Sequence, residues 1–175
     1  LSRGVATGVM ATGVFGVCVV IGMSPALAAD LGSPNSPVLL DVSGDIGATN
    51  SGEMASFDLD MLKALEATTY ETTTIWTEGT QAFTGVTLGA LMEALGVEGG
   101  TIKATAINDY SVEIPFEDAT EGTALIAYMR NHETMSVRDK GPLWVVYNYD
   151  SDTRFQSEVY YSRSIWQLNR LEVSP

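Results

Sequence analysis

The sequence has very few of the side chains that hold metals or act as nucleophiles. Among its 175 residues there is one histidine, His132, and one cysteine, Cys18. Zinc and copper sites are built mainly from His and Cys, so the composition excludes such a site. A Ser-His-Asp triad would depend on His132, and no G-x-S-x-G turn accompanies it. We therefore expect no metal and no serine-hydrolase chemistry.

Positive charge is also scarce. The chain has 9 Lys and Arg against 22 Asp and Glu, a formal net charge of −13 at pH 7. Nucleic acids and anionic membrane surfaces are recognised by clusters of Lys and Arg, and here these residues are scattered. We therefore expect neither as a partner. The acids show no calcium-loop pattern, and Glu117-Asp118 with Glu121 is interpreted as a solvated face.

Residues 1–29 have the pattern of a secretory signal peptide. An apolar run extends from Val5 to Met23, and Ala26-Leu27-Ala28 is a small-x-small cleavage signal. A membrane anchor is the alternative, because about 19 apolar residues can span a bilayer. We predict cleavage, a periplasmic mature protein without cysteine, and membrane contact only through the uncleaved peptide. Residues 30–37 then form a flexible lead-in and residues 38–175 one domain.

The clearest local signal is a short capped helix after Thr87, a residue typical of helix N-caps. Gly96 suits the position just after a helix end. Between them one face is apolar, formed by Leu88, Leu91, Met92 and Leu95.

In the rest of the chain short strands outnumber short helices, and the two do not alternate. This pattern predicts an α+β fold with a mixed, mostly antiparallel sheet. Residues 78–85 and 116–122 are interpreted as irregular. We expect strands over 38–43, 54–57, 68–77, 101–107, 111–115, 124–130, 142–147 and 164–173, and helical turns over 59–66 and 156–162.

Five separate stretches, spread from about Val38 to Val173, agree in residues, order and spacing with one known protein family. They are Phe83 to Val97 with Trp76 before it, Ala106 to Tyr110 with Ile114-Pro115, Tyr128 to Asn131, Lys140 to Tyr147, and Arg163 to Leu168 with Leu171 to Val173. Together they resemble the oxidoreductase molybdopterin-binding family, the pterin domain of sulfite oxidases. The resemblance implies a sulfite-oxidase-like molybdopterin-binding fold and a pterin-shaped pocket.

The sequence departs from that family at the metal ligand. In catalytic members a cysteine thiolate ligates molybdenum, a soft metal, and the expected mature chain has no cysteine. It therefore resembles small periplasmic proteins that bind a free pterin and keep no metal. We expect a non-catalytic, pterin-sensing protein with a pterin or molybdopterin-like ligand. By analogy, its liganded form would dock on the periplasmic domain of a membrane signalling protein.

A pterin site needs an aromatic face, a pair of acceptors for the ring's amino edge and a donor for its carbonyl. Asp109, at the expected hairpin tip, is the first candidate for the edge, because a carboxylate accepts two parallel N–H bonds. A turn Asp bonded to its own backbone is the alternative. Trp76 is the candidate stacking residue, with core burial as the alternative.

The other candidates complete this pocket. Tyr128 and Trp166 are further aromatic candidates, again with core burial as the alternative. Arg130 and Arg163 are the candidate donors, and surface ion pairs are the alternative for each. Lys140-Gly141-Pro142 is interpreted as a structural turn. Asn108 and Tyr110 are assigned to the polar ring of the pocket.

Two other functions stay open. One is a molybdopterin-cofactor-dependent oxidoreductase of the sulfite oxidase family, in which a hydroxyl or carboxylate replaces the cysteine. The other is a structural or interaction module whose pocket has degenerated.

Overall fold

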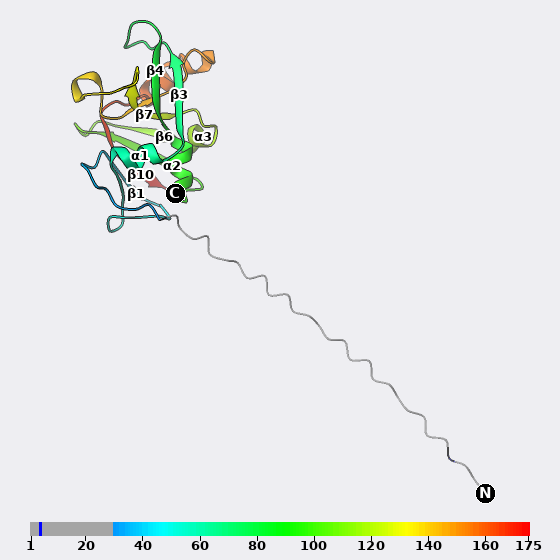
Figure 1. The fold of residues 1–175 in the computed structure, drawn as a ribbon. Helices are drawn as coiled ribbons and strands as arrows, with labels where there is room; N and C mark the ends of the chain where they lie inside the picture. Colours follow the sequence, from blue (N-terminus) through cyan, green and yellow to red (C-terminus); the bar gives the residue numbers. More distant parts are fainter. Residues whose placement is uncertain (1–3, 5–29) are drawn as a thin grey trace.

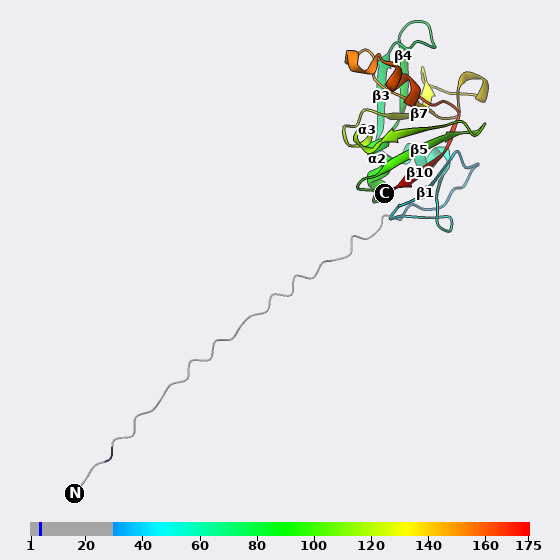
Figure 2. The same ribbon diagram turned by 180° about the vertical axis from the view of Figure 1, so that it is seen from behind.

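The computed structural model describes Gly4 and residues 30–175, which form two β-sheets with short helices around them (Figures 1 and 2). The predicted signal peptide lies outside the described residues, apart from Gly4. No helix of residues 30–175 is long and apolar enough to cross a membrane.

The first sheet has the strand order β2-β1-β10-β5-β6. The last strand of the chain thus lies in its middle, parallel to β1 and antiparallel to β5. The remaining neighbours are antiparallel, as the predicted mixed sheet requires. The bounds are β1 Leu40–Gly44, β2 Ala55–Phe57, β5 Thr101–Ala106, β6 Ser111–Pro115 and β10 Leu168–Ser174.

The second sheet has the order β3-β4-β7-β8, and β9 also pairs with β7. In Figure 1, β3 and β4 rise away from the first sheet, and the loop joining them lies at the opposite end of the domain from the C-terminus. The bounds are β3 Ala67–Thr72, β4 Gln81–Thr87, β7 Leu125–Arg130, β8 Glu133–Thr134 and β9 Trp144–Val146.

The helices are short and lie between or beside the sheets. The α-helices are α1 Leu59–Ala64, α2 Leu88–Ala94, α3 Phe116–Thr120 and α4 Glu158–Arg163, and the 3₁₀ turns are η1 Val137–Asp139 and η2 Thr153–Phe155.

Helix α2 begins and ends as its sequence predicts. The Thr87 hydroxyl accepts a hydrogen bond from the Ala90 N–H at 3.1 Å, which satisfies one free donor of the first turn. Gly96 follows with φ of +68° and donates to the Glu93 carbonyl, while Val97 donates to Met92. These two bonds form a Schellman motif, for which glycine is the favoured residue.

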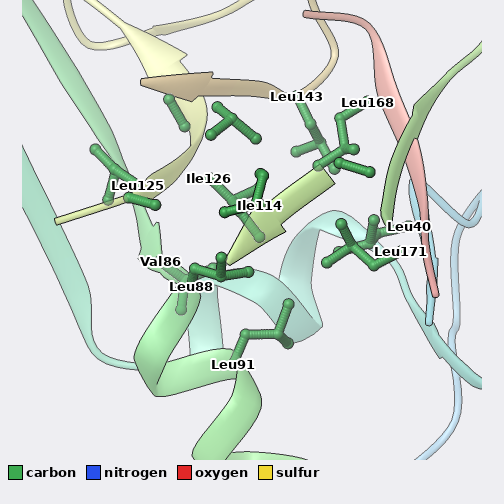
Figure 3. Packing of buried hydrophobic residues seen from close by; sticks show 14 of the residues in the cluster. Leu40, Val86, Leu88, Leu91, Ile114, Leu125, Ile126, Leu143, Leu168 and Leu171 are labelled. Carbon is green, nitrogen blue, oxygen red and sulfur yellow. The ribbon is translucent and has the colours of Figure 1, made fainter. Parts of the chain in front are cut away.

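The apolar face of α2 packs into a core shared by both sheets. Leu88, Leu91, Met92 and Leu95 are each at most 1% exposed. Figure 3 shows Leu88 and Leu91 in one cluster with buried residues of β1, β4, β6, β7 and β10. The core thus joins segments from the start, middle and end of the domain.

The structure corrects the prediction that residues 78–85 form a loop, because β4 begins at Gln81. Gly85 indicated a loop in the sequence, yet it lies inside the strand at a register shift between β4 and β7. A Cβ atom on Gly85 would lie 1.9 Å from the Ile126 carbonyl oxygen. Glycine is needed there for close approach of two strands, and not for a turn.

Among the predicted strands that are shorter than expected, two have a clear cause. β3 ends at Thr72, because the Asp150 carboxylate accepts hydrogen bonds from the Thr73 N–H and hydroxyl at 2.6 and 2.7 Å. Side-chain bonds of this kind compete with a strand ladder. β10 begins only at Leu168, because Gln167 has a φ of +53°. Trp76 and Trp166 therefore lie in loops next to these strands and not in the strands themselves.

The acidic run after β6 is also different from its prediction. Residues 116–120 form α3, and Asp118 is 4% exposed. Its carboxylate accepts hydrogen bonds from the Tyr147 hydroxyl at 2.7 Å and from Arg163 Nη1 at 3.1 Å. A buried carboxylate needs such partners, so the interpretation of Asp118 as part of a solvated face is wrong.

Asp58 connects the lead-in to the domain. Its Oδ1 accepts from the Met61 N–H at 2.9 Å and so caps α1. Its Oδ2 accepts from the N–H groups of Asn35 and Ser36 at 2.8 and 3.0 Å. These backbone donors hold the pKa of the Asp58 carboxyl below its usual range.

Candidate functional site

A pocket of about 300 Å³ opens beside the tip of the β5–β6 hairpin. Its wall has three contributing segments: the hairpin tip, the end of α4 and the loop that leads into β10. The lining residues are Ala106, Asn108, Tyr110, Tyr161, Ser162, Ser164, Ile165, Trp166 and Gln167.

Gln167 fixes how these segments lie. Its carbonyl accepts from the Ile107 N–H at 2.9 Å, and its own N–H donates to the Lys140 carbonyl at 3.0 Å. Its side-chain Nε2 donates to the Val137 carbonyl at 2.8 Å. Figures 1 and 2 accordingly show the hairpin tip and the yellow loop that includes η1 on the same side of the molecule. The loop before β10, which forms one edge of the pocket, is therefore hydrogen-bonded to the β5–β6 hairpin and to the segment around η1.

Trp166 is the largest side chain of the wall and is 39% exposed. It packs edge to face on Trp76 and Trp144, with ring centroids 5.8 and 6.4 Å apart. The ring of Trp76 also packs on that of Tyr161, another residue of the wall, with the centroids 5.7 Å apart. Such T-shaped contacts are favourable for aromatic pairs. Trp76 thus lies behind the wall and supports two of its aromatic side chains.

Lys140 lies against the same rings. Its ammonium nitrogen is 5.2 Å from the centroid of Trp166 and 5.8 Å from that of Trp144. Both distances are within the range of cation–π attraction. The expected turn at Lys140 is present, since this residue has φ of +72°, and its side chain also joins the aromatic cluster.

The hairpin tip places its three polar residues differently. Asn108 and Tyr110 line the pocket, and Asn108 Oδ1 accepts from the Tyr110 N–H at 3.2 Å. Asp109 occupies the left-handed region, with φ of +66°, and its carboxylate forms an ion pair with Arg170. The Asp109 side chain is 81% exposed and is not part of the pocket wall.

The other predicted site residues also lie outside this wall. Tyr128 is 3% exposed within the core, and burial raises its pKa. Arg130 is half-buried at the end of β7. Arg163 pairs with Asp118 and stacks on Tyr160 at 5.3 Å. Arg163 therefore connects α4 with α3.

Ser164 lines the pocket, and its hydroxyl already has hydrogen-bond partners. Ser164 Oγ lies 2.5 Å from the Tyr149 hydroxyl and donates to the Tyr160 carbonyl at 2.7 Å. Tyr149 is 2% exposed, and this burial raises its pKa. The Tyr149 phenol is therefore neutral at physiological pH and serves packing and hydrogen bonding.

The structure thus brings Asn108, Tyr110 and Trp166 together in one pocket, with Trp76 behind it. Sequence reasoning missed Tyr161 and Gln167, although Gln167 belongs to one of the five matching stretches. Its positive φ and its bonds to distant segments have no signal in the sequence.

A larger hollow, of about 710 Å³, lies between α2 and α3 and opens widely to solvent. Glu66, Glu93 and Glu98 are in its wall, and Phe116 is its aromatic residue. It has no pair of aromatic faces for a planar ligand, so the smaller pocket is the better candidate site.

Comparison with solved structures finds a similar fold in the sulfane dehydrogenase SoxCD from Paracoccus pantotrophus, with a TM-score of 0.54. The chain has the sulfite-oxidase-like fold. This confirms the predicted α+β class and architecture. Sequence identity to SoxCD is 16%, and the likeness covers 77% of this chain but only 37% of the SoxCD chain. No family model and no curated protein matches the chain.

The residues of the pocket suit an organic ring and do not suit a soft metal. Residues 30–175 contain no cysteine, and they contain no group of three or more His, Cys, Asp or Glu that could hold a metal ion. The wall offers two amides, hydroxyls and aromatic faces. Soft metals bind thiolates, whereas amides and aromatic rings are the usual partners of planar heterocycles.

Proposed function

We propose that this protein binds a pterin, without catalysing a reaction on it, in the pocket beside the β5–β6 hairpin tip. The observation that carries the proposal is the wall itself, in which Tyr110, Tyr161 and Trp166 surround a space of about 300 Å³. Aromatic side chains stack on flat heterocycles, and few, well-placed polar groups orient them.

The amides of Asn108 and Gln167 are the groups we assign to the polar edge of the ring. An amide has both an acceptor and donors, so it complements a ring edge that presents an amino group next to a ring nitrogen. The Asp109 carboxylate, the first candidate from the sequence, is paired with Arg170. We therefore expect Asp109 to stabilise the hairpin tip and not to contact the ligand.

Isothermal titration with dihydropterin and tetrahydropterin tests the proposal. Trp166→Ala should weaken binding by about tenfold or more, the usual effect of losing a stacking partner. Asp109→Asn should leave the affinity nearly unchanged. Val159→Ala, which removes an exposed apolar side chain of α4 outside the wall, is the matched control. No measurable binding of either pterin to the wild-type protein would contradict the proposal.

We further propose that the protein is exported to the periplasm and that its liganded form docks on the periplasmic domain of a membrane signalling protein. Support for export is the signal-peptide pattern of residues 1–29. The N-terminal sequence of protein from the native host should begin near Ala29 or Asp30. An uncleaved N-terminus would contradict export by this route.

A molybdopterin-cofactor-dependent oxidoreductase is the second candidate, and its support is the fold similarity to a sulfane dehydrogenase. It requires a protein ligand other than cysteine, such as a hydroxyl or a carboxylate. Molybdenum measured in protein isolated from the native host separates the two functions. One molybdenum per chain would favour the oxidoreductase, and a bound pterin without molybdenum would favour binding alone.

A further inference from the structure

Lys140 is held against the pocket by its backbone and by two aromatic rings. Its carbonyl accepts from the Gln167 N–H, and its ammonium lies over Trp144 and Trp166. The ion pairs of the described residues involve Arg154, Arg163 and Arg170, and none of them involves Lys140. The positive charge next to Trp166 is therefore not neutralised by a carboxylate.

The wall of the pocket contains no carboxylate either. Four other hollows on residues 30–175 each include at least one Asp or Glu. At the hairpin tip, the Asp109 charge is compensated by Arg170. The chain as a whole has a formal net charge of −13. At this pocket, by contrast, the positive charge of Lys140 is not balanced by a carboxylate in the wall.

Two physical effects of Lys140 have the same sign. A cation over an aromatic ring is attracted by the negative electrostatic potential of the ring face and partly cancels that potential. A second cation that stacks on Trp166 is therefore bound less strongly. The ammonium also repels a cationic ligand and attracts an anionic one directly, and this interaction is strengthened where water is partly excluded. Both effects disfavour positively charged rings.

We propose that Lys140 is a specificity-determining residue that makes the pocket select neutral or anionic heterocycles over cationic ones. This inference rests on the proposed pterin-binding function and adds the charge class of the ligand. It also gives the Lys140-Gly141-Pro142 turn a role beyond structure, since the turn positions the ammonium over the wall.

Three ligands with the same ring but different charge provide the test: pterin-6-carboxylate, pterin and 6-aminomethylpterin. Titration of the wild-type protein at low salt should give the tightest binding for the carboxylate, with the cation about fivefold weaker than the anion. Lys140→Met should bring that ratio close to one. Lys140→Arg, which keeps the charge, should preserve the order. Arg138→Met is the control, because no ring contact involves Arg138 among the described residues.

The outcomes separate this inference from the proposed function. If the wild-type protein binds none of the three ligands, the proposed function fails. If it binds them and Lys140→Met leaves the ratio unchanged, the role of Lys140 is overturned while pterin binding stands. Should Lys140→Met not fold, the wild-type ratio at two salt concentrations decides, because the preference must shrink as salt screens the charge. A ratio of one at low salt would overturn the inference.

Discussion

Trp76 and Trp166 meet edge to face with their ring centroids 5.8 Å apart, so a half-buried residue of the β3–β4 loop supports an exposed residue of the pocket. We expect Trp76→Ala to lower the free energy of unfolding by about 2–4 kcal/mol, because it leaves a cavity among aromatic rings. It should also weaken pterin binding.

Trp76→Phe keeps an aromatic ring at this position, so it should lose less stability and less pterin affinity than Trp76→Ala. Urea unfolding and titration of both variants check the prediction. Unchanged affinity in a folded Trp76→Ala protein would show that Trp166 does not need this support.

Gly85 gives a second prediction. Gly85→Ala adds a Cβ atom 1.9 Å from the Ile126 carbonyl oxygen, and backbone cannot move aside as a flexible side chain can. We expect a loss of about 1–3 kcal/mol, typical of overpacking. Gly99→Ala is the control, since a Cβ there has nothing within 4 Å. Thermal unfolding of the two variants should separate them clearly, and equal midpoints would contradict the close strand approach.

A third prediction concerns the buried carboxylate of Asp118. Asp118→Asn removes the charge that holds Arg163 and accepts from Tyr147, and should cost about 3 kcal/mol, as breaking a buried ion pair usually does. Asp152→Asn affects an exposed pair with Arg154 and should cost no more than about 1 kcal/mol. Denaturant unfolding at pH 7 measures both. Similar losses of unfolding free energy would mean that the buried Asp118–Arg163 pair stabilises the fold no more than the exposed pair does.

The capping carboxylate of Asp58 makes stability depend on pH. Its pKa in the folded protein is lowered by backbone donors from its usual value of 3.8. The stabilisation is therefore complete above the unfolded-state pKa and is lost as pH falls through the lower folded-state pKa. The stability difference between wild-type protein and Asp58→Asn should shrink as pH drops from 5 to about 2. A difference that stays constant over this range would exclude a role for the charge.

Local signals explain which elements the sequence predicts well. Helix α2 was predicted with its cap, its apolar face and its final glycine, because all three act within ten residues or so of each other. Strand β4 was missed because the reason for Gly85 is a neighbouring strand 41 positions later, at Ile126. Asp118 was misinterpreted for the same reason, since its partners Tyr147 and Arg163 come from distant segments.

The candidate site shows the same division. Asn108, Tyr110 and Trp166 were named from the sequence and line one pocket. Tyr161, which also lines the pocket, and Lys140, which lies over Trp166, were not assigned to the site from the sequence. Their positions depend on how α4 and the turn before β9 fold onto the loop that leads into β10. An aromatic residue can be recognised as a candidate from sequence, but the cation that lies over it cannot.

The position of β10 has a consequence for how the protein is made. This strand follows all the other described strands in the sequence, yet it lies between β1 and β5 and joins the two halves of the first sheet. Without β10, β1 has only β2 beside it and β5 has only β6. Deleting β10 should therefore leave the separate pairs β1–β2 and β5–β6, so the first sheet becomes continuous only once the strand that follows the Trp166 loop has been made.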